Sequence, residues 1–425
     1  MEVFVLFAVF IGALVIGIPV AIALGLSSLS YLLVSGIPLV VVPQKVYAGI
    51  DVFVLLSIPG FILAGNLMNN GGITERIIRF ANALVGWVRG GLGLTNIGAS
   101  MLFGGITGTA VADAASIGGV MIPGMKKAGY PADFSAAVTA ASSTVGPIIP
   151  PSVPMIIVGA LSGISVGQMF MAGAVPGLLM GLAMMITCYV IARRNNFPRE
   201  PWRGTSELVR AFASAFWAIA MTGIIIYGLL SGIATPTENA VVASVYAFVV
   251  GAFVYRELPL KKVPKIIADS AVSAASILAL VGLANVFGWI LVSERIPQAI
   301  AGTVLSITDN PILVVLIINL LLLFVGMFME TIAALIILFV PLLSLAQAVG
   351  IEPLHFATFA VLNLMIGLTT PPVGVCLFVC AGIARLPLSP VVRAILPFLL
   401  SNIIVLLLVS FIPALATWLP NLVFG

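Results

Sequence analysis

Long apolar stretches, separated by short polar segments, run along most of the chain. Each uninterrupted stretch holds roughly the 20 residues that a helix needs to cross the hydrocarbon core of a membrane. The pattern therefore predicts an all-α integral membrane protein. Uninterrupted helices are predicted near residues 3–17, 19–36, 50–69, 168–192, 211–230, 238–255, 267–292 and 391–415.

Four apolar regions do not fit a single uninterrupted helix. The regions near 92–125 and 311–347 each contain a short polar interruption, which predicts a re-entrant helical hairpin that returns to its own side of the membrane. The regions near 133–160 and 354–384 each contain a Pro-Pro pair. They predict broken helices, because proline donates no backbone hydrogen bond and disfavours helix in the residue before it.

One stretch is amphipathic rather than uniformly apolar. A helix near 73–88 would place five apolar side chains on one face and Arg76 and Arg79 on another. Such a pattern is typical of a helix that lies flat at the membrane interface. A short segment, Ile296–Leu305, is its expected counterpart. The five apolar side chains are Ile73, Ile77, Phe80, Leu84 and Trp87.

The composition supports the membrane assignment and excludes other classes. Charged residues make up 8% of the 425 residues, against about 25% in a typical soluble domain. The net charge of +4 comes from basic residues in short loops, which indicates membrane orientation rather than nucleic-acid binding. A single histidine and three cysteines do not supply the usual zinc ligands, and no catalytic Ser/His pair or nucleotide loop predicts an enzyme.

The basic residues also predict the orientation. If the N-terminus is outside and each hairpin returns to its own side, 16 of the 18 basic residues become cytoplasmic, and Lys45 and Arg295 stay outside. Cytoplasmic loops of membrane proteins carry such an excess. The 16 are Arg76, Arg79, Arg89, Lys126, Lys127, Arg193, Arg194, Arg199, Arg203, Arg210, Arg256, Lys261, Lys262, Lys265, Arg385 and Arg393.

The two halves of the chain resemble each other at an offset close to 219 residues. Asn66 matches Asn285, Gly108 matches Gly326, and Pro150-Pro151 matches Pro371-Pro372. With the orientation above, the two repeats are inverted relative to each other. Inverted repeats are typical of secondary transporters that alternate access to a site between the repeats.

Helix breaks inside the membrane suit particular ligands. Backbone carbonyls freed at a break, together with Ser/Thr hydroxyls, form a neutral oxygen cage for a small hard cation such as Na⁺, whereas free helix N-termini suit a carboxylate. Each break could instead be a simple kink. Because the breaks form two repeat-related pairs, the kink is the weaker hypothesis. The breaks are Gly104–Asp113, Ser142–Ser152, Gly326–Thr331 and Gly367–Pro372.

Several polar residues near the breaks have two interpretations. An acid inside the membrane is a functional candidate, but Asp113 is favoured as a helix cap, and Glu330 stays open between the two roles. Asn66 and Asn285 could contact a hairpin or substrate, or simply pack. Glu238 follows a Thr-Pro-Thr turn and is predicted to cap a helix.

Four long motifs resemble the large membrane subunit of tripartite ATP-independent periplasmic (TRAP) transporters, and the resemblance covers almost the whole chain. It implies Na⁺-driven uptake of an organic acid, with sialic acid and C4-dicarboxylates as the main candidates, by an elevator-like alternating-access mechanism. The motifs are Gly104–Gly119, Gly129–Ser152, Tyr227–Asn239 and Gly367–Val375.

The resemblance also implies two sodium sites, formed mostly by backbone oxygens at the hairpin tips and broken helices. Matched to this sequence, one site uses Gly108, Gly146, Ile149 and Ser152. The other uses Gly326, Gly367, Thr370 and Val373. The candidate substrate-binding residues are Asn66, Thr107, Asn285 and Glu330.

The family organisation predicts domains and partners. Scaffold helices would occupy 1–49, transport-domain halves 50–167 and 267–390, connecting and scaffold helices 168–266, and a C-terminal helix 391–425. The expected partners are a soluble periplasmic binding protein and a small four-helix membrane subunit. Because the sequence begins directly at the first apolar stretch, we expect that subunit to be a separate chain. The expected location is the bacterial inner membrane, with the N-terminus in the periplasm.

An ion channel or passive pore is the main competing function. Two hairpins that enter from opposite sides and end inside the membrane leave no continuous pathway, which disfavours a pore. An intramembrane enzyme is disfavoured by the missing catalytic groups.

Overall fold

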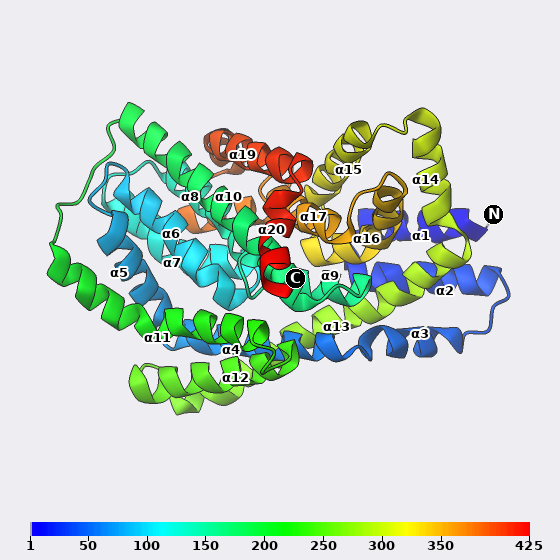
Figure 1. The fold of residues 1–425 in the computed structure, drawn as a ribbon, viewed down its shortest axis with the longest axis horizontal. Coiled ribbons are helices and arrows are strands. Elements are labelled where there is room, and N and C mark those ends of the chain that lie inside the picture. Colours follow the sequence, from blue (N-terminus) through cyan, green and yellow to red (C-terminus); the bar gives the residue numbers. More distant parts are fainter. Residues whose placement is uncertain (1) are drawn as a thin grey trace.

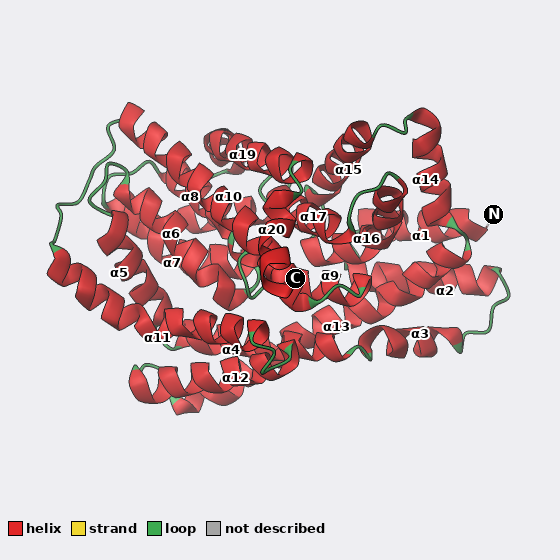
Figure 2. Ribbon diagram, in the orientation of Figure 1, coloured by secondary structure: helices red, strands yellow, loops and turns green. Residues whose placement is uncertain are grey.

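The computed structural model describes residues 2–425, except for the side chains of residues 105–107. The described residues form helices joined by short loops and contain no strand (Figure 2). The α-helices of the first half are α1 (Glu2–Val15), α2 (Val20–Val34), α3 (Val41–Ile50), α4 (Ser57–Asn70), α5 (Ile73–Val85), α6 (Gly91–Thr107), α7 (Ala110–Lys127), α8 (Ala132–Ser143), α9 (Val153–Ser162) and α10 (Val166–Arg194). Those of the second half are α11 (Thr205–Leu230), α12 (Pro236–Val249), α13 (Val263–Ser293), α14 (Ile296–Ile307), α15 (Pro311–Gly326), α16 (Thr331–Ala348), α17 (Pro353–Gly367), α18 (Val375–Ala384), α19 (Leu388–Phe411) and α20 (Ala414–Phe424).

The order of elements repeats along the chain, as the sequence matches predict. In the first half α5 is followed by the pair α6–α7, the broken helix α8–α9 and the long helix α10. In the second half α14, α15–α16, α17–α18 and α19 follow in the same order. The helices α5 and α14 lie at opposite ends of the molecule and run across the direction of the long helices (Figure 1). This placement is what inversion of the second repeat requires.

The helices pack as two groups. The central group, defined as α6–α9 with α15–α18, joins the repeats through contacts of α18 with α7 and α8, and of α16 with α9. The peripheral group, defined as α1–α4 with α11–α13, is held by contacts of α4 with α12 and of α13 with α2, α3 and α4. The two groups meet where α4 contacts α6 and α13 contacts α16. Both α4 and α13 therefore pack mainly on peripheral helices, although the predicted boundaries assign their residues to the transport-domain halves.

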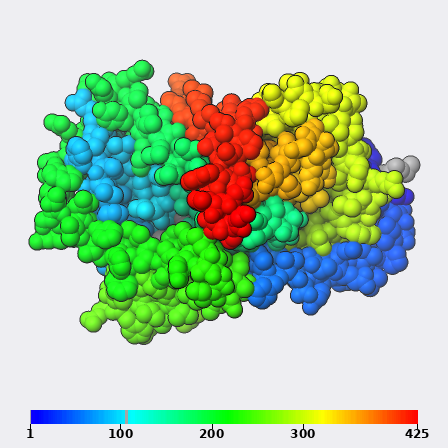
Figure 3. All heavy atoms as spheres, viewed as in Figure 1, coloured from blue at the N-terminus to red at the C-terminus, as the bar shows by residue number. Residues whose placement is uncertain are grey.

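Two helices were not predicted from the apolar pattern. The helix α3 ends at its C-cap residue Asp51, and a 3₁₀ turn η1 (Phe53–Leu56) separates it from α4. The last predicted helix ends near 415, but the chain continues as α20, which contacts α10 and α17. Figure 3 shows this C-terminal segment in red, lying on one face between cyan and green segments on the left and yellow and orange segments on the right.

Within residues 2–425, seven helices are long and apolar enough to cross a membrane. They are the helical segments Phe53–Asn70, Val166–Arg194, Thr205–Leu230, Pro236–Val254, Leu260–Ser293, Thr331–Ala348 and Leu388–Phe411. The helical segments Ala132–Ile148 and Val153–Ser162 are bent by 42° relative to each other. If they form one span, the number rises to eight. The predicted dozen stretches exceed this number because several, including α17 and α18, are shorter apolar helices.

Local sequence signals fix several helix ends. Thr235 accepts a hydrogen bond from the backbone N–H of Glu238, and the Glu238 carboxylate accepts one from the N–H of Thr235 at 2.7 Å. This reciprocal pair is a capping box, which satisfies two backbone donors that the helix itself cannot. The predicted capping role of Glu238 is confirmed.

The amphipathic helix α5 differs partly from its prediction. Ile73 and Ile77 are buried, but Trp87, just beyond the helix, is 48% exposed, so only part of the apolar face packs on protein. The opposite face is not simply solvated. Arg76 pairs with Glu257 at 2.7 Å, and Arg79 pairs with Glu207 at 2.8 Å. These pairs connect α5 to α11 and to the loop that follows α12.

Candidate ion and substrate site at the helix breaks

In the second repeat, the end of α15 lies directly against the end of α17. A β-carbon added to Gly367 would lie 2.6 Å from the α-carbon of Gly326 and 2.9 Å from its carbonyl oxygen. Only glycine permits such an approach between two backbones. Two residues predicted for one sodium site, from different helices, are therefore brought together.

In the first repeat, the corresponding contact is made by Gly104 rather than Gly108. A β-carbon on Gly104 would lie 1.8 Å from the α-carbon of Gly146. Gly108 is four residues further on, at the left-handed φ of +64° that ends α6, and faces Val153 instead. The predicted partners Gly108 and Gly146 thus lie at one break but do not make the contact that Gly326 and Gly367 make.

The break between α8 and α9 ends in a buried cap. The Ser152 hydroxyl donates to the carbonyl of Pro147 and accepts a hydrogen bond from the backbone N–H of Met155 at 3.2 Å. Ile149 has an extended backbone that separates the 3₁₀ turn η2 (Gly146–Ile148) from α9. The carbonyls of Val145 and Gly146 still accept hydrogen bonds from the N–H groups of Ile148 and Ile149, and the chain leaves the helical ladder at Ile149, as a cation cage requires.

The break between α17 and α18 has a similar construction with different side chains. The Thr370 hydroxyl donates to the carbonyl of Ile366 at 2.9 Å, which leaves its own lone pairs available. Val373 is half-buried, and Gly374 follows it with a left-handed φ of +58° and donates its N–H to the carbonyl of Met327. That bond joins the break to the turn between α15 and α16.

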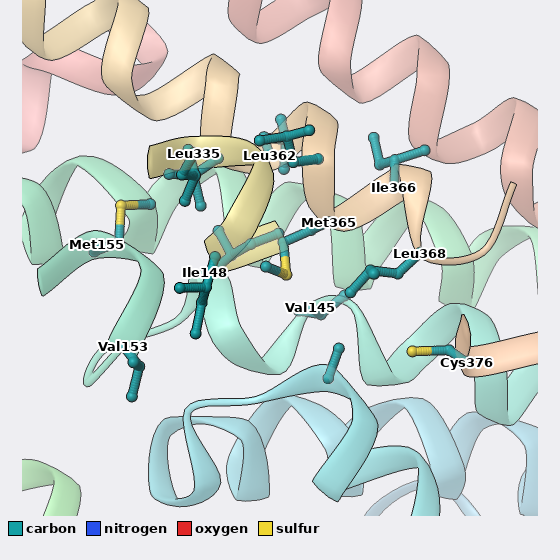
Figure 4. Packing of buried hydrophobic residues seen from close by; sticks show 14 of the residues in the cluster. Val145, Ile148, Val153, Met155, Leu335, Leu362, Met365, Ile366, Leu368 and Cys376 are labelled. Atoms are coloured by element: carbon teal, nitrogen blue, oxygen red, sulfur yellow. The ribbon is translucent and has the colours of Figure 1, made fainter. Parts of the chain in front are cut away.

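The two breaks share one apolar core. Figure 4 shows Val145 and Ile148, beside the first break, facing Met365 and Leu368 of the second. All four side chains are at most 2% exposed. The two candidate ion sites therefore belong to a single packed body rather than to separate halves.

Buried amides tie each helix pair to its broken helix, and sequence reasoning missed them. In the first repeat Asn96 donates to Thr139 at 2.6 Å and accepts from Ser142 at 3.2 Å. In the second, Asn363 donates to the side-chain oxygen of Asn319 at 2.8 Å. Asparagine inside an apolar helical stretch is the signal that could have identified these positions.

The carboxylates of Glu330 and Asp113 differ in their hydrogen bonds. Glu330 accepts hydrogen bonds from the backbone N–H groups of Ile332 and Ala333 and caps α16. The cap expected of Asp113 is wrong: α7 begins after Thr109, and Asp113 lies inside its first turn. Asp113 is fully buried, and neither of its oxygens has a hydrogen-bond partner among the described residues.

The remaining candidate substrate residues are placed as follows. Asn66 donates to Ser270 at 2.8 Å and joins α4 to α13. Asn285 donates to the carbonyl of Lys45 at 2.7 Å and joins α13 to α3. Both amides thus have packing contacts within the peripheral group. The side chain of Thr107 lies outside the described residues.

Neutral oxygen donors dominate both breaks. The described residues contain no group of three or more His, Cys, Asp or Glu side chains that could hold a transition metal. Hard cations prefer carbonyl and hydroxyl oxygens as ligands, whereas nitrogen and sulfur ligands favour softer metal ions. The residues present therefore fit a small cation such as Na⁺ bound at each break.

The family described as "Tripartite ATP-independent periplasmic transporter, DctM component" matches residues 7–415. The chain belongs to this family. As a TRAP large permease, it is a transporter subunit rather than an enzyme and one component of a tripartite system.

Relatives of this TRAP permease include the sialic acid TRAP transporter large permease protein SiaM of Vibrio cholerae, 42% identical, with 98% of this chain and 97% of SiaM covered. The C4-dicarboxylate large permease protein DctM of the same organism is 39% identical, with 100% and 99% covered. SiaT of Haemophilus influenzae, a sialic acid TRAP permease, is 38% identical, with 99% of this chain but 68% of SiaT covered.

Two solved transporters share the fold of the TRAP permease. MtrF of Neisseria gonorrhoeae aligns with a TM-score of 0.62 at 12% identity, with 89% of this chain and 83% of MtrF covered. YdaH of Alcanivorax borkumensis aligns with a TM-score of 0.59 at 14% identity, with 86% and 87% covered. At these identities the comparison describes architecture and not activity.

The glycine that replaces Gly108 in the close contact could have been found from the repeat. Gly104 and Gly326 are 222 positions apart, close to the 221 that separate Gly146 from Gly367. Matching Gly108 to Gly326 instead used an offset of 218.

Proposed function

We propose that this TRAP permease takes up an organic acid into the bacterial cytoplasm, driven by two or more Na⁺ ions. The observation that carries the proposal is the pair of repeat-related helix breaks, each with freed carbonyls beside a buried hydroxyl or a glycine contact. One Na⁺ binds near Gly146, Ile149 and Ser152, with Gly108 at the same break. The other binds near Gly326, Gly367, Thr370 and Val373.

The substrate binds between the two breaks, close to the ends of the helix pairs. A carboxylate there is stabilised by helix N-termini, as at the start of α9, where free N–H groups and the helix dipole point at the ligand. Thr107 and Glu330 lie at the helix-pair ends, which makes them the nearest of the candidate substrate residues. Asn66 and Asn285 act more remotely, since each is held in a contact between peripheral helices.

Transport follows an elevator-like movement of the central group against the peripheral group. The hairpins α6–α7 and α15–α16 re-enter the membrane from opposite sides, so neither provides a path across. The shared core of the two breaks favours movement as one body. The helices α5 and α14 lie at opposite membrane interfaces and brace this body.

The partners follow from the organisation of the tripartite system. A soluble periplasmic protein delivers the substrate, and a small four-helix membrane subunit extends the peripheral group. The names of the relatives support sialic acid or a C4-dicarboxylate as substrate. The permease resides in the inner membrane with its N-terminus in the periplasm, as the distribution of basic residues favours.

Uptake into proteoliposomes tests the coupling. The permease, its small subunit and its binding protein are reconstituted, and uptake of labelled sialic acid and labelled succinate is measured with an inward Na⁺ gradient, an equal K⁺ gradient or none. We expect uptake of one acid only with Na⁺. Equal uptake with K⁺ would refute sodium coupling, and downhill flux without the binding protein or Na⁺ would indicate a passive pore.

Accessibility of single cysteines tests the orientation. On a cysteine-free background, Lys126→Cys should react only with reagents added to the cytoplasmic side, and Lys45→Cys only with reagents added outside. Labelling of both from one side would refute the inverted topology.

A further inference from the structure

A cavity of about 380 Å³ lies between the two helix groups, away from the helix breaks. Its walls come from α3 and α13 on the peripheral side and from α9 and α16 on the central side. These four helices lie close together in the right half of Figure 1. The cavity extends to Pro297 at the start of α14, which places it toward that end of the molecule. Its volume falls within the range of small-molecule pockets.

The lining of this cavity is apolar with one charge. Among the described residues that line it, Lys45 is the single charged side chain and Asn285 the single amide. The remaining lining residues are aliphatic side chains, glycine, proline and Trp289. A ligand that matches this lining has an apolar body and one negative charge, because an apolar wall cannot satisfy further polar groups.

The charge is held in a defined place. The Lys45 ammonium lies 5.3 Å from the centre of the Trp289 ring, and the Lys45 carbonyl accepts a hydrogen bond from Asn285 at 2.7 Å. Gly49 permits this approach, since a β-carbon there would lie 2.5 Å from that of Asn285. The contacts fix the backbone of Lys45 and leave its ammonium without a carboxylate partner within 4.0 Å among the described residues.

We propose that this cavity binds a single-chain amphipathic carboxylic acid, such as a medium-chain fatty acid. The carboxylate pairs with Lys45, and the chain lies among the aliphatic side chains of α9, α13 and α16. The volume equals that of roughly a dozen water molecules, which accommodates one short chain but not a two-chain phospholipid. A dicarboxylate or a polyhydroxylated acid would leave polar groups unpaired against the apolar wall.

The bound acid inhibits transport, because it fills space between helices of both groups. This consequence rests on the proposed movement of the central group, whereas the binding itself does not. A ligand that contacts both groups stabilises the arrangement in which the cavity exists, and it opposes any arrangement in which α9 and α16 have shifted.

Binding is measured by quenching of Trp289. The four other tryptophans are replaced by phenylalanine, and the purified permease in nanodiscs is titrated with 11-bromoundecanoic acid. We expect saturable quenching. The methyl ester of the same acid, which lacks the charge, should bind at least about tenfold more weakly, since a charged hydrogen bond is lost. Equal quenching by acid and ester would overturn the proposal.

Glycine variants separate the cavity from the surrounding lipid. Gly288 lines the cavity and has no atom within 4 Å of its would-be β-carbon, so Gly288→Leu directs a side chain into the cavity with no clash at the β-carbon. Gly302→Leu, at an equally open position on α14 outside the cavity, is the matched control. We expect saturable quenching to be lost in Gly288→Leu, retained in Gly302→Leu, and about tenfold weaker in Lys45→Gln. Identical titrations of both glycine variants would overturn the proposal.

Titration with a brominated phosphatidylglycerol tests whether a phospholipid occupies the cavity instead. If it displaces the bromo acid and loses its quenching in Gly288→Leu, the occupant is a phospholipid and the proposal is wrong. Uptake in proteoliposomes is then assayed with undecanoic acid, which should inhibit the unmodified permease and the Gly302→Leu variant at concentrations about tenfold below those that inhibit Lys45→Gln. Saturable binding without inhibition would refute the inhibitory role and leave the binding site standing.

Discussion

The two repeats of this TRAP permease place the same backbone contact at each helix break but surround it with different polar groups. Gly104 meets Gly146 in the first repeat, and Gly326 meets Gly367 in the second. Among the described residues of the first repeat, Thr109 makes no side-chain cap, and the buried carboxylate of Asp113 has no hydrogen-bond partner. In the second, Glu330 caps the helix after the turn.

This difference separates two requirements of the site. The glycine contact brings two backbones together and recurs in both repeats, as expected if the close approach itself is needed. The polar groups vary, as expected if backbone oxygens supply most of the ligands of the two proposed Na⁺ sites. Substitutions of the contact glycines and substitutions of the surrounding polar groups should therefore have effects of different size.

The largest effect is expected at the glycine contacts. A methyl group in Gly104→Ala would lie 1.8 Å from Gly146, and one in Gly367→Ala 2.6 Å from Gly326, so the helices must separate. Such overpacking typically costs about 1–3 kcal/mol, and uptake should be lost in both variants. Thermal unfolding and uptake are measured together. The controls are Gly119→Ala and Gly382→Ala, because no atom lies within 4 Å of a β-carbon added at either glycine. Normal uptake by both contact variants would show that the approach is not required.

A smaller effect is expected at the hydroxyl beside the second break. Thr370→Ala removes one oxygen from the proposed sodium site, and the Na⁺ concentration for half-maximal uptake should rise about tenfold, while docking of the binding protein is unchanged. Thr370→Ser should restore the original value. Thr369→Ala is the matched control, because Thr369 donates to the same Ile366 carbonyl. Equal sodium dependence in all three variants would remove Thr370 from the site.

The carboxylates of Glu330 and Asp113 should contribute differently to the stability of the protein. Glu330→Ala removes the cap of α16 and should lower the free energy of unfolding by about 1 kcal/mol. Asp113→Asn removes a buried carboxyl group that has no hydrogen-bond partner among the described residues, so the free energy of unfolding should stay unchanged or rise. Thermal unfolding of both variants decides this. A larger loss for Asp113→Asn would reveal a stabilising partner for that carboxylate in the folded protein.

The smallest effect is expected at the ion pair that connects α5 to the loop after α12. The Arg76 guanidinium holds the pKa of Glu257 below its usual value of 4.5. A lowered folded-state pKa means that the pair stabilises the protein above about pH 4.5 and that this stabilisation is lost as the pH falls through the lower value. Because the Glu257 side chain is 45% exposed, Glu257→Gln should cost at most about 0.5 kcal/mol.

The measurement is thermal unfolding of wild type and Glu257→Gln between pH 3.5 and pH 7. The difference in melting temperature should be constant near neutral pH and disappear in acid. A difference that grows toward pH 3.5 would contradict this account. At the opposite end of the molecule, Glu294 is bonded by the uncharged hydroxyl of Tyr31, so no matching ion pair is expected there.

Much of the fold was predictable from the sequence because apolar length and proline position determine it directly. The pairs α6–α7 and α15–α16 and both broken helices were predicted close to their observed positions. The missed helices have physical reasons. The helix α3 is short and contains Pro43, so its apolar pattern merges with a loop, and α20 follows Pro413, beyond the last predicted span.

The site was predicted as a region but not in its contacts. Pro-Pro pairs mark the breaks regardless of what packs around them, whereas the contact between Gly104 and Gly146 depends on how two distant helices meet. Similarly, the hydrogen bond between Asn319 and Asn363 joins residues 44 positions apart. Such contacts are set by helix packing, which a local sequence pattern does not specify.

The peripheral group also has a mechanical asymmetry. The 31-residue helix α13 is continuous and about 46 Å long, whereas its counterpart in the first repeat is divided into α3, η1 and α4, with a bend at Asp51-Val52. A continuous helix resists bending along its whole length, but a divided one yields at its joint. Elastic deformation of the frame should therefore concentrate in the first repeat. If the central group moves as proposed, the restoring force on it would differ between its two end positions.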